Sequence, residues 1–229
     1  MEREFLNLSL NATLNESLRN AARHGSLTRV KQLLNRGANI HARDRKGKQP
    51  IHYAAERDNL AYAKELLNRG ANIHARDKYG QNPLHIASSY GQLPIVKELL
   101  NRGANIHARD IFHHHPLHLA SSYGQLPIVK ELLNRGANIH ARDKFGLHPL
   151  HIAAGTGHLN VVKELIRRGA NPKNLMTRPM YYNSVANYVK NLMRQNYLKH
   201  MVKYETGTLK RPKFSINTLV KSLRETKFL

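Results

Sequence analysis

A 33-residue period constrains this chain more than any other feature of its sequence. An Arg-Gly-Ala-Asn block recurs at Gly37, Gly70, Gly103, Gly136 and Gly169, and four copies of Asn-Ile-His-Ala-Arg-Asp end at Asp44, Asp77, Asp110 and Asp143. The stretch Ala87–Asp110 returns unchanged as Ala120–Asp143, which indicates duplication of one unit. Because a fixed period between about 20 and 50 residues is typical of repeat proteins, we predict an array in which each unit packs on its neighbours.

Each unit carries the signals of two helices. Proline begins a short apolar run at Pro50, Pro83, Pro116 and Pro149, where it suits the first turn of a helix. Glycine then ends this helix near Gly91, Gly124 and Gly157. A second helix follows, in which Leu93, Val96, Leu99 and Leu100 form an apolar stripe. The rest of the unit is predicted to be an extended hairpin loop. Because the two helices are the regular elements of each unit, the predicted fold class is all-α.

The period divides the chain into three parts. Residues 1–11 form a lead-in, residues 12–176 the repeat array, and residues 177–229 a basic, helical C-terminal extension. The repeats are predicted at about 12–43, 44–76, 77–109, 110–142 and 143–176, and Pro172 marks the end of the register. Within the extension, residues 215–224 have the spacing of a short basic amphipathic helix, which could either cap the array or contact a partner.

Two segments carry a resemblance to a known family. Asn82-Pro83-Leu84-His85-Ile86-Ala87 and Asn101-Arg102-Gly103-Ala104-Asn105-Ile106 resemble the ankyrin-repeat pattern, and the likeness covers about residues 12 to 174. The resemblance implies a solenoid of stacked helix pairs with hairpin loops at right angles to them. It also implies a concave face made by hairpins and first helices, protein binding, and no catalytic residues.

The chain departs from the family pattern at two kinds of position. The threonine before proline is replaced by Gln49, Asn82, His115 and His148, of which only Asn82 is a favourable helix N-cap. The turn glycine of the hairpin becomes His113 in the fourth unit. We therefore expect the fourth hairpin to differ in shape from the others.

Composition narrows the expected cellular location and the chemical class of the partner. The chain has no cysteine, its N-terminus lacks the pattern of a signal peptide, and no stretch is apolar enough to span a membrane. An intracellular, cytoplasmic location is expected, including delivery into a host cell. The net charge of +22 indicates an acidic partner such as nucleic acid, an anionic membrane or an acidic protein face, without choosing among them.

Catalytic, metal and cofactor sites are not expected. The recurring aspartates precede turns, where a carboxylate accepts backbone N–H groups. The cluster of His113, His114, His115 and His118 suggests a metal site, but histidines such as His118 and His85 match the structural histidine of the family. Whether the histidines that recur in successive repeats respond to mild acid is left open.

The best binding candidates are side chains that the resemblance places on the concave face. They are Arg45, Lys46, Arg57, Lys78, Tyr79, Tyr90, Ile111, Phe112, His114, Tyr123, Lys144 and Phe145. Tip aromatics beside cations have the composition of a binding hot spot, although they could instead pack on neighbouring hairpins.

The predicted function is that of a monomeric, non-enzymatic scaffold or adaptor. It would bind another protein with an acidic face through the concave surface, and no small-molecule substrate is expected. The alternative is binding of nucleic acid or anionic lipid through the basic surface and the C-terminal helix.

Overall fold

The computed structural model describes residues 2–175, with side chains from residue 10 onward except 173 and 174. These residues contain ten α-helices, one short 3-10 helix and no strand, which confirms the all-α prediction. The predicted C-terminal extension lies outside the described residues. The chain divides into two compact units, Met1–Pro149 and Leu150–Leu229, and each is described by itself.

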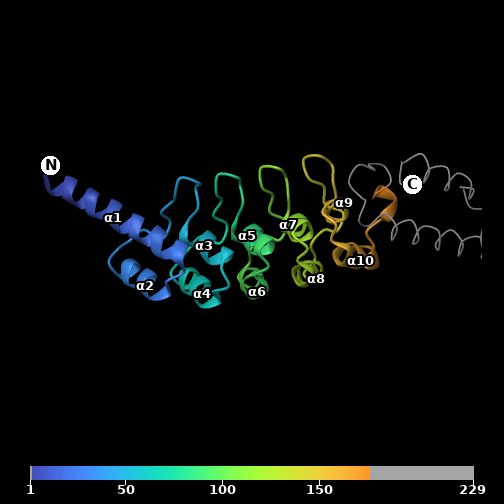
Figure 1. The fold of residues 1–229 in the computed structure, drawn as a ribbon. Helices are drawn as coiled ribbons and strands as arrows, with labels where there is room; N and C mark the ends of the chain where they lie inside the picture. The colour runs from blue at the N-terminus through green and yellow to red at the C-terminus, as the bar shows by residue number, and fades with distance from the viewer. Residues whose placement is uncertain (1, 176–229) are drawn as a thin grey trace, which may run out of the picture. The chain divides into compact units, whose positions relative to one another are not determined.

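The first unit is built from helix pairs joined by hairpin loops (Figure 1). First helices lie in one row, second helices in another, and the hairpins project from the first-helix row. The pairs are α1 (Glu2–His24) with α2 (Leu27–Asn35), α3 (Pro50–Glu56) with α4 (Leu60–Asn68), α5 (Pro83–Tyr90) with α6 (Leu93–Asn101), and α7 (Pro116–Ser122) with α8 (Leu126–Asn134). The predicted lead-in is the helical N-terminal part of α1.

Helix α9 (Pro149–Gly155) begins at the last residue of the first unit. The described part of the second unit continues with α10 (Leu159–Arg167) and the 3-10 helix η1 (Pro172–Leu175). Val161, Val162 and Leu165 of α10 are buried, so this helix keeps the apolar stripe of the other second helices.

The third repeat shows how the sequence sets the helix ends. Asn82 caps α5 by accepting a hydrogen bond from the His85 backbone N–H at 3.0 Å. Gly91 ends the helix with φ 81°, a left-handed conformation that glycine adopts without a steric penalty. As the sequence predicts, neither Gln49 nor His115 forms such a side-chain cap at the starts of α3 and α7.

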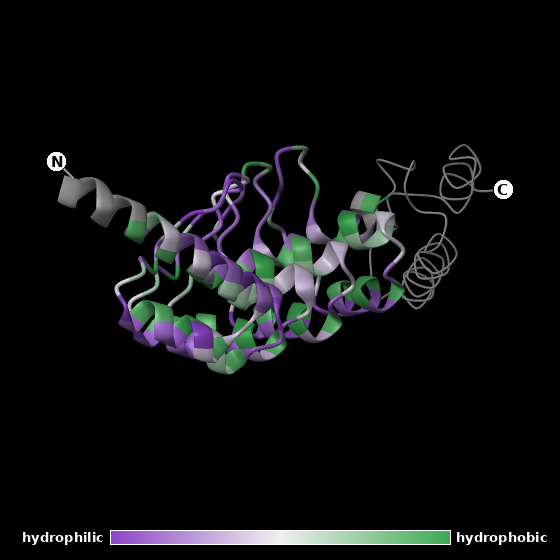
Figure 2. Cartoon of the chain, turned by 60° about the vertical axis from the view of Figure 1, so that its left-hand side comes forward, coloured by the Kyte–Doolittle hydropathy of each residue, from purple (hydrophilic) through white to green (hydrophobic). Residues whose placement is uncertain are grey.

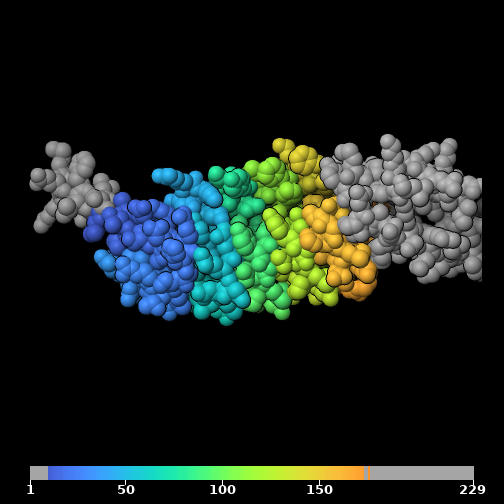
Figure 3. Space-filling model, viewed as in Figure 1, coloured from blue at the N-terminus to red at the C-terminus, as the bar shows by residue number. Residues whose placement is uncertain are grey.

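The core of the first unit lies between the two helix rows. In α6, Ile95, Val96 and Leu99 are fully buried, and α8 repeats the arrangement with the same three residue types. Each such side chain contributes about 1.5–3 kcal/mol through its burial. Figure 2 shows apolar stripes on the helices and mostly hydrophilic hairpins, and in Figure 3 the repeats of the first unit abut one another without a gap on the viewed face.

Polar side chains also join neighbouring repeats. The Gln92 side chain donates to the Glu56 carbonyl, and the Gln125 side chain donates to the Ser89 carbonyl, each at 3.2 Å. These carbonyls lie near the ends of α3 and α5, where a helix leaves its last carbonyls without partners inside the helix. Helices α6 and α8 therefore each begin with a glutamine that gives a partner to a carbonyl of the first helix of the preceding repeat, a link that the sequence analysis missed.

The fourth hairpin has the same shape as its neighbours, so the expectation of a different shape is wrong. His113 has φ 59°, close to the 73° of Gly80, and it is the only non-glycine residue with positive φ within residues 2–175. Its N–H donates to the Asp110 carbonyl at 3.0 Å, as the N–H of Gly80 does to the Asp77 carbonyl. The hydrogen bonds of the turn outweigh the preference of histidine for negative φ.

His113→Gly is expected to raise the free energy of unfolding by about 1 kcal/mol, because it relieves a left-handed conformation that L-residues disfavour. Urea unfolding measures the change. His74→Gly is the matched control, since His74 is an exposed hairpin histidine without positive φ. This control should lose stability through the added freedom of its unfolded chain. A His113→Gly protein no more stable than the parent would contradict the argument.

Candidate functional site

The hairpins are held by their aspartates. The Asp77 Oδ1 atom accepts the backbone N–H groups of Tyr79 and Gln81 at 2.9 Å. Corresponding pairs of bonds form at Asp44, Asp110 and Asp143, all at 2.8 Å. The prediction that these aspartates are turn residues is confirmed.

Neighbouring hairpins are joined by single backbone hydrogen bonds near their tips. The N–H of Lys78 donates to the Lys46 carbonyl at 2.9 Å, the N–H of Ile111 to the Tyr79 carbonyl at 3.0 Å, and the N–H of Lys144 to the Phe112 carbonyl at 2.8 Å. The tips therefore hold a regular spacing along the first unit, while the side chains at the tips remain free to face outward.

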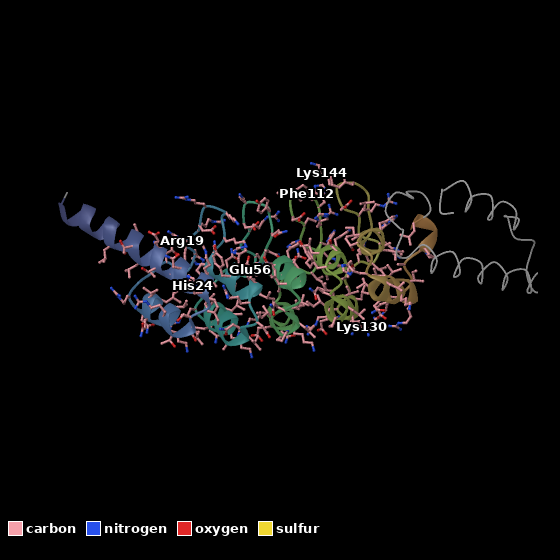
Figure 4. All side chains as sticks on the ribbon, in the orientation of Figure 1. Arg19, His24, Glu56, Phe112, Lys130 and Lys144 are labelled. Carbon is pink, nitrogen blue, oxygen red and sulfur yellow. The ribbon has the colours of Figure 1, made fainter. Side chains whose placement is uncertain are left out.

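Large apolar side chains gather on the hairpins and at the ends of the first helices. We call this set the hairpin face: Tyr79, Tyr90, Ile111, Phe112, Tyr123 and Phe145, each between 42% and 60% exposed. Among the described residues only one other large apolar side chain, Leu10, is exposed. In Figure 4, Phe112 lies at a hairpin tip, on the side of the molecule away from Lys130 of α8. The predicted tip aromatics are thus accessible rather than packed away.

In the second repeat, the surface that corresponds to the hairpin face is polar. At the base of its hairpin, Lys48 forms an ion pair with Glu56 at the end of α3. The Tyr53 hydroxyl donates to Asp44 and accepts a hydrogen bond from Arg23 at 3.3 Å. Sequence reasoning missed the Lys48–Glu56 pair, because eight residues separate its members and only the packing of loop on helix brings them together.

Positive charge is spread over both rows of the first unit. On the hairpin side, the predicted cations Arg45, Lys46, Arg57, Lys78 and Lys144 are exposed, and the Lys78 ammonium lies 4.9 Å from the Tyr79 ring centroid. The second-helix row also exposes cations, namely Lys31, Lys64, Lys97 and Lys130. The feature specific to the hairpin face is therefore its apolar side chains and not its charge.

His114 is the predicted binding residue that lies deepest. Its side chain is 23% exposed and sits between two hairpins. The Nδ1 atom is 3.3 Å from Asp110 Oδ2 and the Nε2 atom is 3.6 Å from Asp143 Oδ2.

The buried histidines connect each first helix to the next hairpin. In His85 and His118 the Nδ1 atom accepts the N–H of the residue before the proline, at 3.3 and 3.1 Å. The Nε2–H group then donates to the carbonyl of His114 at 3.0 Å or of Leu147 at 3.2 Å. Burial lowers the pKa of His85 to about 4 and that of His118 to about 3, so both stay neutral in mild acid while the array is folded.

Within residues 2–175, no group of three or more histidine or acidic side chains is arranged to hold a metal ion. In the same part of the chain, no helix combines the length and apolar character needed to cross a membrane.

Comparison with known proteins agrees with this architecture. The family model described as ankyrin repeats (3 copies) matches residues 18–110 and 114–201, more than half of the chain. A search of the curated proteins found no match. Ankyrin repeats are in general modules for protein–protein interaction rather than enzymes. With its helix pairs, projecting hairpins and buried histidines, the chain belongs to the ankyrin-repeat family.

Proposed function

We propose that this protein is a non-enzymatic adaptor that binds another protein through the hairpin face. The observation that carries the proposal is the gathering of six exposed apolar side chains on the hairpins and first-helix ends. Aromatic anchors surrounded by polar groups dominate many protein interfaces, and isolated exposed apolar residues do not form such a set. The protein acts as a monomer inside the cell, where the absence of cysteine is unremarkable.

The partner carries an acidic surface. Lys78 and Lys144 directly precede the tip aromatics Tyr79 and Phe145. The four hairpin aspartates accept hydrogen bonds from backbone N–H groups of their own turns. An acidic rim around an apolar centre would complement this arrangement and speed association at low salt.

Nucleic acid or anionic lipid is the competing partner class, and the distribution of charge separates it from a protein. A polyanion site requires cations concentrated along one surface, whereas here they occupy both rows of the first unit. The localised apolar set favours a protein partner.

The test is a triple substitution, Tyr79→Ala, Phe112→Ala and Phe145→Ala. We expect capture of the partner to weaken by at least about 100-fold, because hot-spot residues each contribute about 2 kcal/mol or more. The melting temperature should change little, since all three side chains are exposed. Binding is measured from nuclease-treated lysate, and then with the purified partner, by titration calorimetry.

A matched control removes Lys64, Lys97 and Lys130 from the second-helix row, where the net charge falls but the hairpin face stays intact. Capture should survive in this control. Equal losses in both variants, or loss of capture on nuclease treatment alone, would point to a polyanion. A large loss of helicity in the aromatic variant would make these residues structural.

A further inference from the structure

Two rows of exposed side chains run along the hairpin side of the first unit. The tip row is formed by the second residue after each hairpin aspartate: Lys46, Tyr79, Phe112 and Phe145. The backbone N–H of each of these residues donates to the aspartate Oδ1 atom at 2.8 or 2.9 Å, so their side chains leave the hairpins at equivalent positions. The helix-end row is formed by residues 33 positions apart at the ends of the first helices: His24, Arg57, Tyr90 and Tyr123. The second, third and fourth repeats thus each contribute one side chain to each row.

Both rows change from basic to aromatic at the same place. In the tip row Lys46 of the second repeat is followed by Tyr79 of the third, and in the helix-end row Arg57 is followed by Tyr90. From there to the last position of each row, every residue is aromatic. On its N-terminal side the hairpin face is therefore continued by a basic surface. We call its exposed residues Arg45, Lys46 and Arg57 the cationic patch.

The cationic patch is not neutralised by the acidic residues of its own repeat. Asp44 of the hairpin and Glu56 of α3 already have basic partners, Arg23 at 3.7 Å and Lys48. Asp58 is exposed at the end of the same helix, so one acid stands against three cations. Within the part of the chain that the structure describes, the three cations form no ion pair. An acidic group of a partner therefore meets unpaired positive charge there.

The spacing of the repeats selects the conformation of a partner segment. Helices α3, α5 and α7 pack side by side (Figure 1), and packed helices lie about 8–10 Å apart. The carbonyl of each of the first three tip-row residues accepts an N–H from the next hairpin, which keeps the tips in step with the helices. A polyproline II segment turns once in three residues and advances about 9.3 Å, so every third side chain meets the next repeat. In a β-strand, side chains on one face recur after about 6.7 Å and fall out of step.

We propose that the partner of the hairpin face contributes a linear segment in the polyproline II conformation. An acidic side chain of this segment lies on the cationic patch, and apolar side chains follow at three-residue intervals on Tyr79, Phe112 and Phe145. The inference rests on the proposed function and specifies the partner of that same surface. Aromatic-lined surfaces bind such segments in several domain families. Residues 177–229 of this chain do not fit, because they contain only two acidic residues, Glu205 and Glu225.

The first test is a selection from random peptides of about 15 residues, long enough to pass four hairpins at about three residues each, on the full-length protein. We expect the enriched peptides to carry an acidic residue towards one end and apolar residues at three-residue intervals beyond it, in either chain direction. Enriched peptides with alternating apolar residues, or with no preference of acidic residues for one end, would overturn the proposal. The absence of enrichment over a support without the protein would do the same.

Charge reversal tests where the acidic end lies. For the tightest enriched peptide, Lys46→Glu with Arg57→Glu is expected to weaken binding at least about 10-fold at low salt and to reduce its salt dependence. The matched control is Lys97→Glu with Lys130→Glu on the second-helix row, where both lysines are exposed, and it should change the affinity less than about twofold. Fluorescence anisotropy measures binding, and circular dichroism checks that both variants are folded. Equal losses in the two variants would reduce the effect to general charge attraction and reject the placement.

A peptide in which lysine replaces the acidic residue supplies the reciprocal test. It should bind the Lys46→Glu, Arg57→Glu variant at least about 10-fold more tightly than the unsubstituted protein. At the opposite end of the tip row, Phe145→Ala should weaken binding of the original peptide about 10-fold or more and leave its salt dependence unchanged. Binding that needs the cationic patch but not Phe145 would mean that acidity alone is recognised, and the linear arrangement would be wrong.

Capture from lysate separates this inference from the proposed function. If capture is lost in the triple aromatic variant but survives Lys46→Glu with Arg57→Glu, the proposed function stands and the acidic segment is rejected. If nothing is captured and no peptide is enriched, both fail. Displacement of the captured partner by the enriched peptide supports both.

Discussion

Lowering the pH from about 6.5 to about 4 is expected to remove on the order of 7 kcal/mol from the free energy of unfolding. The cause is the burial of His85 and His118, which lowers their pKa values to about 4 and about 3 in the folded array. Burial lowers the pKa of His52 as well, so this residue adds to the loss. Since domains are stable by only about 5–15 kcal/mol, the array should unfold before pH 4 is reached.

The sign follows from proton binding. Below pH 6.5 the unfolded histidines take up protons while the folded ones remain neutral, so the unfolded state binds more protons and stability falls as pH falls. Each histidine contributes about 1.4 kcal/mol per pH unit in this window. The stabilisation is fully present above about pH 6.5, and for His85 the loss ends near its folded pKa of about 4.

The measurement is urea unfolding at half-unit steps of pH from 7.5 to 4.5. His118→Gln should reduce the slope of stability against pH by about one proton, although it also loses the hydrogen bond to the Leu147 carbonyl. His74→Gln, on the exposed part of a hairpin, should leave the slope unchanged. If the slope of unfolding free energy against pH is unchanged by His118→Gln but reduced by His74→Gln, the acid sensitivity comes from surface histidines.

Leu99→Ala in the middle of the array is expected to lower the free energy of unfolding by about 3 kcal/mol or more. Leu99 is fully buried on α6, so the substitution loses apolar contact and leaves a cavity that its packed neighbours cannot fill. Because each repeat packs only on adjacent ones, the loss should also weaken the coupling between the two halves of the array.

The duplicated unit supplies the controls. Leu132 occupies the same position in α8 and is also fully buried, so Leu132→Ala should cause a similar loss. Leu100 is adjacent in sequence but only half-buried, and Leu100→Ala should cost about 1 kcal/mol. Chemical denaturation followed by circular dichroism measures all three. Equal effects for Leu99 and Leu100 would mean that the apolar stripe does not face the core as described.

The sequence was sufficient to predict the elements that depend on local signals repeated in one register. Proline at the helix start, glycine at the helix end and aspartate at the turn act within a few residues of themselves, so their roles in the third repeat follow from Pro83, Gly91 and Asp77. The exposure of tip aromatics such as Phe112 also agrees with the sequence prediction. Whether they bind a partner stays a prediction.

Features that depend on contact between repeats could not be predicted. The glutamine links, the Lys48–Glu56 pair and the contacts of His114 with Asp110 and Asp143 join groups whose distance is set by the packing of helices and hairpins. The predicted shape of the hairpin at His113 was wrong for a related reason. Histidine does prefer negative φ, but the hydrogen bonds that outweigh this preference could not be predicted from the sequence of the loop.

The glutamine links have a consequence for how the gene can change. Gln92 and Gln125 begin identical helices, and each makes the same hydrogen bond with the repeat before it. An unequal crossover between the duplicated segments would remove or add 33 residues and keep a glutamine of this kind at the start of the second helix. The array can thus change length by recombination with this link preserved, and the contacts that change are those of the hairpins and first-helix starts outside the duplicated stretch.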